Sequence, residues 1–591
     1  MKSVRMRSLN RFAAVLIILL GLVPTHVEPA LNKRASVDVA KQERKRLVLL
    51  IVVDQFRYDY LTRFGDLFES KGIGRLMREG ASWTHANYDQ VPTYTAPGHA
   101  SLMTGSWPRQ NGIVANDWFE RETGKKVTSV TDETTKLLEG LPNATGYSPR
   151  RLLCSTVGDE LRQATNNRSK VIGISAKGRS AILPSGRRAS AAYWYSMDNG
   201  NMVSSTYYFN RVPDWVEQFN RRHMVDEWFG ARWDRLLPER EYFKRAGQDE
   251  VPWENLDKAS RDSNSFPHFV TGVAASPDKS FYRAIDYSPF SNDLLLAFAQ
   301  TAITNEKLGA DDETDVLTIS FSANDHVGHR FGPNSQEVMD MALRVDRQIG
   351  ALLDFVDAQV GLRNTVVIFS ADHGVAPVPE YRRARKLSGR RTPEADFRKV
   401  VEDGLKKRYG ARAGDYIQTF GTRKEPGVIN ANIYLNYAAL TRDGVDQAEV
   451  EQVVGKLAMR VPGVKTYFTR TQLENNDISL SNPIARRVRN GFYPARSGDV
   501  IVVLEPYEFL FEIPSDPADT LWTATHGSAF GYDTHVPLII MGQEFVAGKY
   551  KKPATPADIA PTVARVLGMS PPSCSSGRVL SEAFATSQQK R

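Results

Sequence analysis

The fold class is decided by one stretch near the start of the chain, Leu47-Val48-Leu49-Leu50-Ile51-Val52-Val53-Asp54. An unbroken apolar run that is rich in β-branched residues is typical of a strand buried on both faces of a parallel sheet. The run stops at Asp54, which follows the last apolar residue directly. The sequence therefore predicts a buried parallel strand with a carboxylate at its carboxyl end.

Similar apolar runs recur along the chain, and several lead into charged residues. They cover residues 171–174, which lead to Lys177, residues 315–320, which lead to Asp325, residues 365–369, which lead to Asp372 and His373, and residues 500–504 and 536–541. Helical patterns lie between them, for example over residues 335–355 and 393–409. This alternation predicts an α/β fold with a mostly parallel central sheet flanked by helices. In such folds ligands bind beyond the carboxyl ends of the strands.

Two parts of the chain interrupt the alternation. Residues from about 182 to 290 are rich in Trp, Tyr, Asn and Ser, and residues from about 380 to 500 carry many Arg and Lys residues. We interpret both as insertions on one core sheet rather than as independent domains. The sequence shows no internal repeat of the kind that indicates a solenoid.

The composition is that of an ordinary globular protein. Charged residues make up 24% and hydrophobic residues 41% of the 591 residues, which excludes a disordered, a collagen-like or a polytopic membrane protein. The net charge of +8 is small for this length, so nucleic-acid binding is not indicated. The two cysteines, Cys154 and Cys574, are too few for a disulfide scaffold or a Cys-rich zinc module, and the sequence leaves open whether they pair. Any bound metal must then be held by His, Asp and Glu.

The N-terminal 30 residues are typical of an export signal. Their positively charged start comprises Lys2, Arg5, Arg7 and Arg11. The apolar run that follows, residues 12–23, is too short for a comfortable membrane span and suits the core of a signal peptide. A signal peptide over residues 1–30 predicts a periplasmic or secreted protein with no membrane span in the mature chain. The alternative is an uncleaved N-terminal anchor.

Aspartate and histidine residues form the strongest chemical signal. They are Asp54 after the first strand, Asp325 and His329 in Asn-Asp-His-Val-Gly-His, Asp372 and His373 in Ser-Ala-Asp-His-Gly, and His526 in Thr-His-Gly-Ser. Without cysteine, three carboxylates and three imidazoles suit two borderline divalent ions, zinc first among them. A single Asp–His pair is more often a hydrogen-bonded core pair. Three such sites, at strand ends or in Gly-containing turns, favour metal binding.

A threonine with a proline two residues later offers a nucleophile. In Thr95-Ala96-Pro97-Gly98-His99, Pro97 suits the first turn of a helix, where its missing N–H costs nothing. We expect Thr95 just before the helix N-terminus, where free backbone N–H groups attract phosphate. A hydroxyl beside metal ions can be ionised and attack phosphorus. The alternative is that Thr95 only caps the helix.

Two cations follow the strand at residues 171–174, in Ser175-Ala176-Lys177-Gly178-Arg179. Lys177 and Arg179 on a tight loop can converge on a pair of phosphate oxygens, which Arg binds bidentately. A solvated pair of loop residues is the alternative. The position at a strand end favours phosphate binding.

Taken in order, these motifs resemble a known family. The order Asp, Thr, Asn, Lys-x-Arg, Asp-x-x-x-His, Asp-His, His is similar to that of the alkaline phosphatase superfamily, and within it to the monomeric bacterial alkaline phosphatases with a threonine nucleophile. These are related to the nucleotide pyrophosphatase/phosphodiesterases. The resemblance runs from about residue 46 to 581. It implies a monomeric enzyme with a three-layer core that hydrolyses small-molecule phosphate monoesters, with diesters as alternative substrates.

The resemblance also assigns roles residue by residue. One zinc ion would be held by Asp325, His329 and His526, and a second by Asp54, Asp372, His373 and Thr95. Thr95 would be the nucleophile that forms a phosphothreonine, and the phosphate would be contacted by Asn116, Lys177 and Arg179. His326 and His535 match no ligand position of the family.

Three other functions fit parts of the pattern. A phosphodiesterase or nucleotide pyrophosphatase would use the same metals and nucleophile, but a diester has one fewer charged oxygen for Lys177 and Arg179 to bind. A sulfatase would have a modified Cys or Ser before x-Pro-x-Arg, where this chain has Thr95, Pro97 and His99. A non-catalytic, zinc-stabilised phosphate-binding protein would lack the nucleophile.

Overall fold

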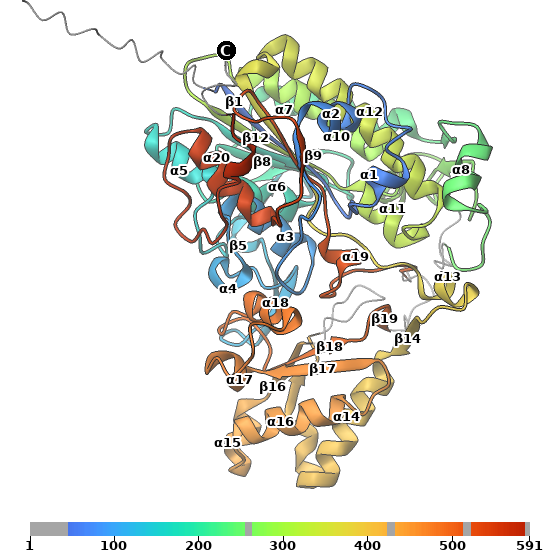
Figure 1. Cartoon of the computed structure of the whole chain (residues 1–591), viewed down its shortest axis with the longest axis vertical. Helices are drawn as coiled ribbons and strands as arrows, with labels where there is room; N and C mark the ends of the chain where they lie inside the picture. The colour runs from blue at the N-terminus through green and yellow to red at the C-terminus, as the bar shows by residue number, and fades with distance from the viewer. Residues whose placement is uncertain (1–44, 255–262, 422–431, 512–521, 586–591) are drawn as a thin grey trace, which may run out of the picture. The chain divides into compact units, whose positions relative to one another are not determined.

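A large mixed sheet forms the centre of the computed structural model, which describes residues 45–254, 263–421, 432–511 and 522–585 (Figure 1). Its strands follow the order β21-β2-β20-β13-β1-β12-β7-β8-β9-β5-β6. Their bounds are β1 (Leu47–Val53), β2 (Ala81–Trp83), β5 (Thr131–Leu138), β6 (Thr145–Tyr147), β7 (Val171–Ser175), β8 (Ala191–Tyr195), β9 (Met202–Ser205), β12 (Asp315–Phe321), β13 (Thr365–Ser370), β20 (Leu538–Met541) and β21 (Gly548–Tyr550). The predicted export signal, residues 1–30, lies outside the described residues.

The predicted α/β class is confirmed, and the parallel strands lie at the middle of the sheet. β13, β1, β12, β7 and β8 are all parallel to their neighbours in this group. At its two sides β20 pairs antiparallel with β13, and β9 pairs antiparallel with β8. The sheet as a whole is therefore mixed, with a parallel centre and antiparallel additions.

Helices cover both faces of this sheet, which explains the unbroken apolar run of β1. Leu47, Leu49, Ile51 and Val53 pack into a core that includes α10 (Pro289–Glu306) and α12 (Gln336–Gln359). The alternate residues Val48, Leu50 and Val52 pack into a second core with α3 (Thr95–Thr104), α5 (Val157–Ala164) and α20 (Ile559–Val566). Because successive side chains of a strand point to opposite faces, a strand between two helical layers must be apolar throughout.

One predicted core strand belongs elsewhere. Residues 500–504 form β18 (Val500–Leu504), which lies in a separate four-stranded antiparallel sheet with β15 (Ile417–Thr419), β16 (Asn432–Leu435) and β17 (Val464–Thr469). This sheet packs on α14 (Glu394–Tyr409) and α16 (Gln447–Ala458) around its own apolar core (Figure 1). The expectation that residues 500–504 continue the central sheet is wrong, because an apolar run does not specify which sheet buries it.

The central sheet also extends into the interval 182–290, which we expected to be an insertion. β8 pairs in register with β7, so that Trp194 lies opposite Ser175, and β9 follows as its antiparallel neighbour. The aromatic residues that hid this strand in the sequence are buried: Tyr193 packs in the same core as α10, and Trp194 faces the other side.

Within the described ranges, none of the helices combines the length and apolar character that crossing a membrane requires.

The two cysteines are joined. The Cys154–Cys574 disulfide links residues 420 positions apart, from the segment before α5 to the segment after α20. It therefore fixes the C-terminal part of the chain to the helical layer that carries α3 and α5.

We expect removal of this disulfide to lower thermal stability without abolishing the fold. A cross-link restricts the unfolded chain, and its loss costs about 2–4 kcal/mol in typical proteins. The unfolding midpoint of the parent protein should fall on reduction and should match that of a Cys154→Ala/Cys574→Ala variant. Reductant should leave the variant's midpoint unchanged. A parent midpoint that does not move, with reduction verified by thiol titration, would contradict this expectation.

Candidate active site

The predicted site residues gather at the carboxyl end of the parallel strands. Val53 of β1 lies opposite Phe321 of β12, and Val52 lies opposite Ser370 of β13, so these three strands end at nearly the same level. The residues that follow the strands include Asp54, Asp325, Asp372 and His373. The register of the sheet therefore brings together side chains that are far apart in the sequence.

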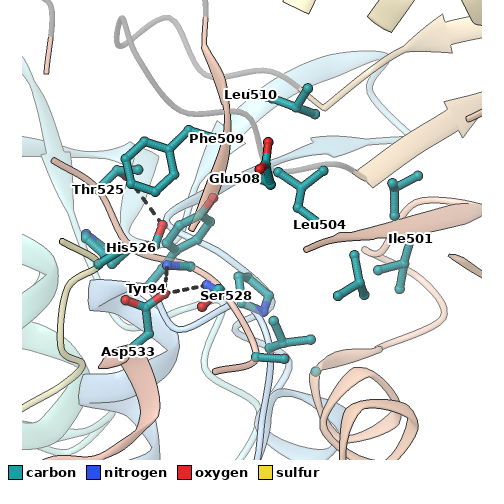
Figure 2. A pocket seen from close by; sticks show the side chains of 18 of the residues that line it. Tyr94, Ile501, Leu504, Glu508, Phe509, Leu510, Thr525, His526, Ser528 and Asp533 are labelled. Atoms are coloured by element: carbon teal, nitrogen blue, oxygen red, sulfur yellow. Dashed lines mark hydrogen bonds between the residues drawn. The ribbon is translucent and has the colours of Figure 1, made fainter. Parts of the chain in front are cut away.

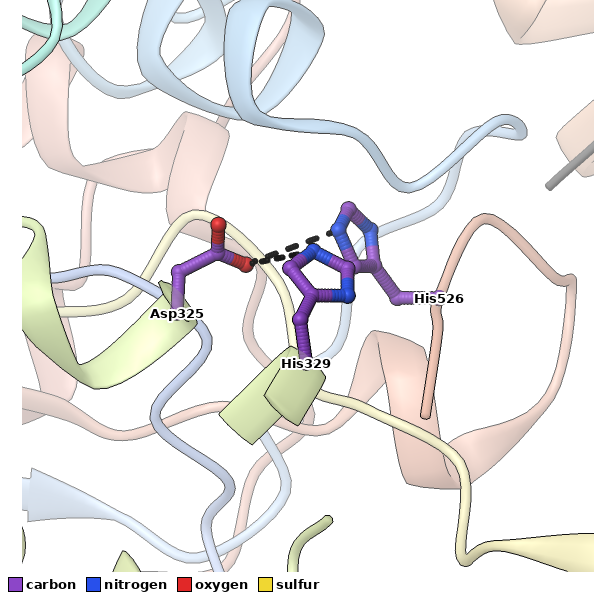
Figure 3. Close-up of side chains that lie close together, drawn as sticks. All are labelled: Asp325, His329 and His526. Atoms are coloured by element: carbon purple, nitrogen blue, oxygen red, sulfur yellow. Dashed lines mark ion pairs between the residues drawn. The ribbon is translucent and has the colours of Figure 1, made fainter. Parts of the chain in front are cut away.

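The first ligand group consists of Asp325, His329 and His526, all buried (Figure 3). Asp325 and His329 lie one turn apart on α11 (Ala323–Phe331), so both side chains leave the same face of the helix. His329 Nε2 lies 3.2 Å and His526 Nε2 lies 3.6 Å from Asp325 Oδ1. The ligand atoms of the three residues lie within 4.8 Å of one another, as a shared metal ion requires.

The second ligand group consists of Asp54, Asp325 and His373. His373 Nε2 lies 3.4 Å from Asp54 Oδ1 and 3.3 Å from Asp372 Oδ2, so the predicted ligand Asp372 borders this group. Asp325 belongs to both groups, which the sequence did not predict. The two groups are therefore neighbours, and the rings of His373 and His526 stack with their centroids 3.6 Å apart.

Backbone carbonyls orient the three imidazoles. Nδ1 of His329 donates to the carbonyl of Ala524 at 2.8 Å, and Nδ1 of His373 donates to that of Gly374 at 2.9 Å. Nδ1 of His526 donates to the carbonyl of Thr93 at 2.8 Å. A carbonyl only accepts, so each Nδ1 carries a proton and each Nε2 is left facing the ligand groups.

Burial sets the protonation of these groups. It lowers the pKa of His373 and lowers that of His526 well below its usual range, which keeps both rings neutral at neutral pH. Burial raises the pKa of Asp54 well above its usual range, and the charges of Asp325 and Asp372 raise it further. Burial acts the same way on Asp325, but its interactions with His329 and with the ammonium of Lys177 outweigh burial and hold the pKa of Asp325 well below the usual range.

The residues present fit metal cations. Asp54 Oδ1 and Asp372 Oδ2 are buried and accept no hydrogen bond. Three buried carboxylates face one ammonium, that of Lys177, so the cluster is short of positive charge. Buried carboxylates normally pair with cations or coordinate metals, and neutral imidazoles with free Nε2 atoms complete such a ligand set.

Thr95 lies beside the second ligand group. It is the first residue of α3 rather than the residue before the helix, because Tyr94 is the extended N-cap and Pro97 falls in the first turn. Its side chain is buried, and Thr95 Oγ1 lies 3.4 Å from His373 Nε2. Close packing holds α3 there: a Cβ at Gly98 would lie 2.2 Å from the carbonyl oxygen of Asp372, so only glycine fits.

Of the three further predicted residues, Asn116 contacts the helix that carries Thr95 and Lys177 contacts the ligand groups. Asn116 Oδ1 accepts a hydrogen bond from the backbone N–H of Ala96 at 2.8 Å, in the first turn of α3. Lys177 Nζ donates to Asp54 Oδ2 at 2.7 Å and also to Asp325 Oδ2. Arg179 lies in the first turn of α6 (Gly178–Ser185), and its Nε is buried without a hydrogen bond. In this structure Lys177 thus pairs with carboxylates of the ligand groups.

Two residues that the sequence did not single out connect the site. The backbone N–H of Gln55 donates to Asp372 Oδ1 at 3.1 Å, and its Nε2 donates to Asp325 Oδ1 at 2.6 Å. His99 Nδ1 lies 2.9 Å from the carbonyl oxygen of Thr95 and 3.3 Å from Asp372 Oδ2. The sequence contains only their positions as an indication of a role in the site. Gln55 directly follows Asp54, and His99 lies one helical turn after Thr95.

Comparisons with known proteins agree with this geometry. The family model for type I phosphodiesterase / nucleotide pyrophosphatase matches residues 48–533. The chain belongs to this family. It thus falls in the alkaline phosphatase superfamily, as the sequence predicted.

Relatives match over nearly the whole chain. A protein from Myroides odoratus named calcium-transporting ATPase is 35% identical, over 92% of this chain and 95% of its own length. The alkaline phosphatase PafA of Elizabethkingia meningoseptica is 34% identical, over 91% of this chain and 94% of its own length. The crystal structure of PafA superposes with a TM-score of 0.81 at 33% identity, over 92% of this chain and 99% of that structure.

Because Asp325 belongs to both ligand groups, its loss should affect metal binding most. We expect Asp325→Ala to retain less divalent metal per chain than either His329→Ala or His373→Ala, each of which removes a ligand from one group only. The measurement is elemental analysis of zinc-loaded protein after gel filtration in metal-free buffer.

His223→Ala is the matched control, because this ring is 64% exposed and lies outside both groups. It should retain as much metal as the parent. Parent protein with less than about one divalent ion per chain would contradict the metal site.

Proposed function

We propose that this chain is an exported alkaline phosphatase that hydrolyses phosphate monoesters with two zinc ions and a phosphothreonine intermediate on Thr95. One observation carries the proposal: the Thr95 hydroxyl, two candidate metal-ligand groups and the ammonium of Lys177 lie together at one end of the central sheet. The resemblance to PafA, which is named an alkaline phosphatase, supports the same activity.

The residues of the two ligand groups would hold the metals. Asp325, His329 and His526 would bind one ion, and Asp54, Asp372, His373 and Thr95 the other. Zinc bound there would supply the positive charge that ionises the Thr95 hydroxyl and stabilises negative charge on the oxygens around phosphorus. Cations in both groups would also offset the carboxylates with which Lys177 pairs here, and its ammonium would then be available to a phosphoryl oxygen.

The reaction is a double displacement on Thr95. The Thr95 hydroxyl gives its proton to solvent, its Oγ attacks phosphorus, the bond to the ester oxygen breaks, and the leaving oxygen takes up a proton from solvent as the alcohol departs. Water then attacks phosphorus, the Oγ–P bond breaks, a proton from that water restores the Thr95 hydroxyl, and inorganic phosphate leaves. Thr95 is held for this attack at the N-terminus of α3, where the backbone N–H groups favour an anion.

Preference for monoesters rests on three side chains. A monoester dianion has three non-bridging oxygens whose charge must be balanced in a site with little water. Lys177 and Arg179 supply charge, and Asn116 supplies a donor, because its Oδ1 is occupied by the N–H of Ala96 while its Nδ2 can donate. A diester has one fewer charged oxygen and gains less from the cationic pair.

A phosphodiesterase is the second candidate, because the matching family model is that of type I phosphodiesterases and nucleotide pyrophosphatases. It would use the same ligand groups and the same threonine. The two candidates therefore differ in the role of Lys177 and Arg179.

Export is supported by two features. The N-terminal 30 residues have the charge and apolar pattern of a signal peptide. The Cys154–Cys574 disulfide is typical of proteins that fold in an oxidising compartment. We propose a periplasmic or secreted location on both grounds.

Substitution of Thr95 tests the nucleophile. Thr95→Ser keeps a hydroxyl and should retain substantial activity, whereas Thr95→Ala should lose at least about a hundredfold in kcat/KM, because the covalent route is removed. Mass spectrometry of acid-quenched parent protein should find phosphate on Thr95. Phosphate on the nearby Ser101 or Ser180 instead would refute the assignment.

The double variant Lys177→Ala/Arg179→Ala tests substrate preference. Charge-assisted hydrogen bonds contribute roughly 1.5–3 kcal/mol each, so monoester hydrolysis should fall on the order of a hundredfold or more in kcat/KM. Diester hydrolysis should fall much less, with bound zinc unchanged. Equal losses on an aryl phosphate and its diester would show that the pair does not set the preference, and would favour the phosphodiesterase.

A further inference from the structure

A cavity of about 90 Å³ lies next to the first ligand group (Figure 2). One of its walls comes from Tyr94 and the loop 525–529 of the core. The opposite wall comes from β18 and from β19 (Glu508–Phe511), which follow the second predicted insertion in the sequence. We call this space the side cavity.

The side cavity adjoins the candidate active site at His526. His526 belongs to the first ligand group and also lines the cavity. Its ring meets the ring of Tyr94 edge to face, with centroids 5.6 Å apart, and Tyr94 directly precedes Thr95. The same two short segments therefore carry the nucleophile, a metal ligand and one wall of the cavity.

The direction in which the leaving group departs is toward the side cavity. In an in-line displacement the leaving oxygen lies across phosphorus from the attacking oxygen. Thr95 Oγ1 contacts the second ligand group through His373, so the leaving oxygen faces the first ligand group, where His526 lies. An organic group attached to that oxygen enters the side cavity.

The far wall of the cavity is apolar. Ile501, Val503 and Leu504 come from β18, and Phe509 and Leu510 come from β19. In Figure 2, Ile501 and Leu504 lie across the cavity from Tyr94 and His526. An alkyl or aryl group that leaves water against these side chains is stabilised by the hydrophobic effect.

No Lys or Arg is among the described residues that line the cavity. The charged residues there are acidic: Glu505, which pairs with Lys465 outside the cavity at 2.9 Å, Glu508, whose Oε2 accepts no hydrogen bond, and Asp533. Glu508 lies 3.6 Å from Arg390, which offsets part of its charge. Among these described residues, a second anionic group in the cavity would lose water without gaining a cationic partner, which is costly.

Direct contacts between Tyr507 and Tyr532 hold the two walls of the side cavity together. The backbone N–H of Tyr507, in the turn between β18 and β19, donates to the hydroxyl of Tyr532 at 3.1 Å. The two tyrosine rings pack with centroids 4.8 Å apart. Tyr532 follows the loop that carries His526, so the apolar wall is fixed to the core beside the ligand group.

We propose that the side cavity binds the organic group of the substrate and selects monoesters of uncharged aryl or alkyl alcohols over esters that carry a second anionic group. This proposal rests on the proposed function, because it concerns the leaving group of the same reaction.

The test compares two substrates whose phenols are similarly acidic, phenyl phosphate and 3-carboxyphenyl phosphate. The parent should favour phenyl phosphate several-fold in kcat/KM. Leu504→Ala/Phe509→Ala should lower kcat/KM for phenyl phosphate about tenfold, as expected when an apolar pocket loses contacts. Inhibition by inorganic phosphate, which has no organic group, should stay unchanged. Leu480→Ala, at an exposed leucine outside the cavity, is the matched control and should behave as the parent.

A second variant is expected to gain a preference for the charged substrate. Its test therefore does not depend on whether the protein tolerates the loss of two large side chains. Leu504→Lys places a cation in the half-buried wall and should shift the preference toward 3-carboxyphenyl phosphate about tenfold or more. An unchanged preference in this variant, or a parent that turns over both esters equally well, would overturn the proposal and leave the proposed function intact. A parent that hydrolyses no ester would overturn the proposed function itself, and with it this proposal.

Discussion

Buried negative charge at one end of the central sheet is the constraint on which the rest of the site depends. Asp54, Asp325 and Asp372 lie side by side with little access to water, and in this structure the ammonium of Lys177 is shared between two of them. Uncompensated charges of this kind strongly disfavour a folded state. An arrangement that requires cations explains three features of the site. The imidazoles turn their Nε2 atoms inward, the amide groups of Gln55 donate to the carboxylates, and two carboxylate oxygens accept no hydrogen bond.

The ligand groups and the apolar wall that we propose contacts the substrate come from different parts of the chain. The ligand groups and Thr95 lie on loops and helix ends fixed by the register of the parallel strands, whereas the apolar wall beside them comes from β18 and β19. The four-stranded sheet that contains β18 has its own core, so its surface residues can change without disturbing the metal ligands. Substitutions in the wall formed by β18 and β19 would therefore change which organic groups fit the side cavity and leave the ligand groups as they are.

The sequence predicted the α/β class and the central parallel strands, because a strand covered by helices on both faces must be apolar throughout. It assigned β18 to the wrong sheet and overlooked β8, since an apolar run does not reveal its partner and aromatic residues obscured the strand. It named the Asp and His residues that form the two groups from residue type and position. It missed the sharing of Asp325 and the roles of Gln55 and His99, which depend on side-chain directions that appear only after folding.

The order of the strands has a consequence for how the chain matures. β2, near the start of the described chain, pairs only with β20 and β21, which come from residues 538–550. The disulfide partner of Cys154 is likewise Cys574, which is synthesised 420 residues later. During synthesis, β2 and the Cys154 thiol therefore remain without these partners until residues 538–574 have been made. Such non-local closure is slow and leaves strands open to wrong partners in the interval. A nearly complete chain thus passes through a stage in which its central strands are present but its last strands and its disulfide are not yet in place, and misfolding is favoured at this stage.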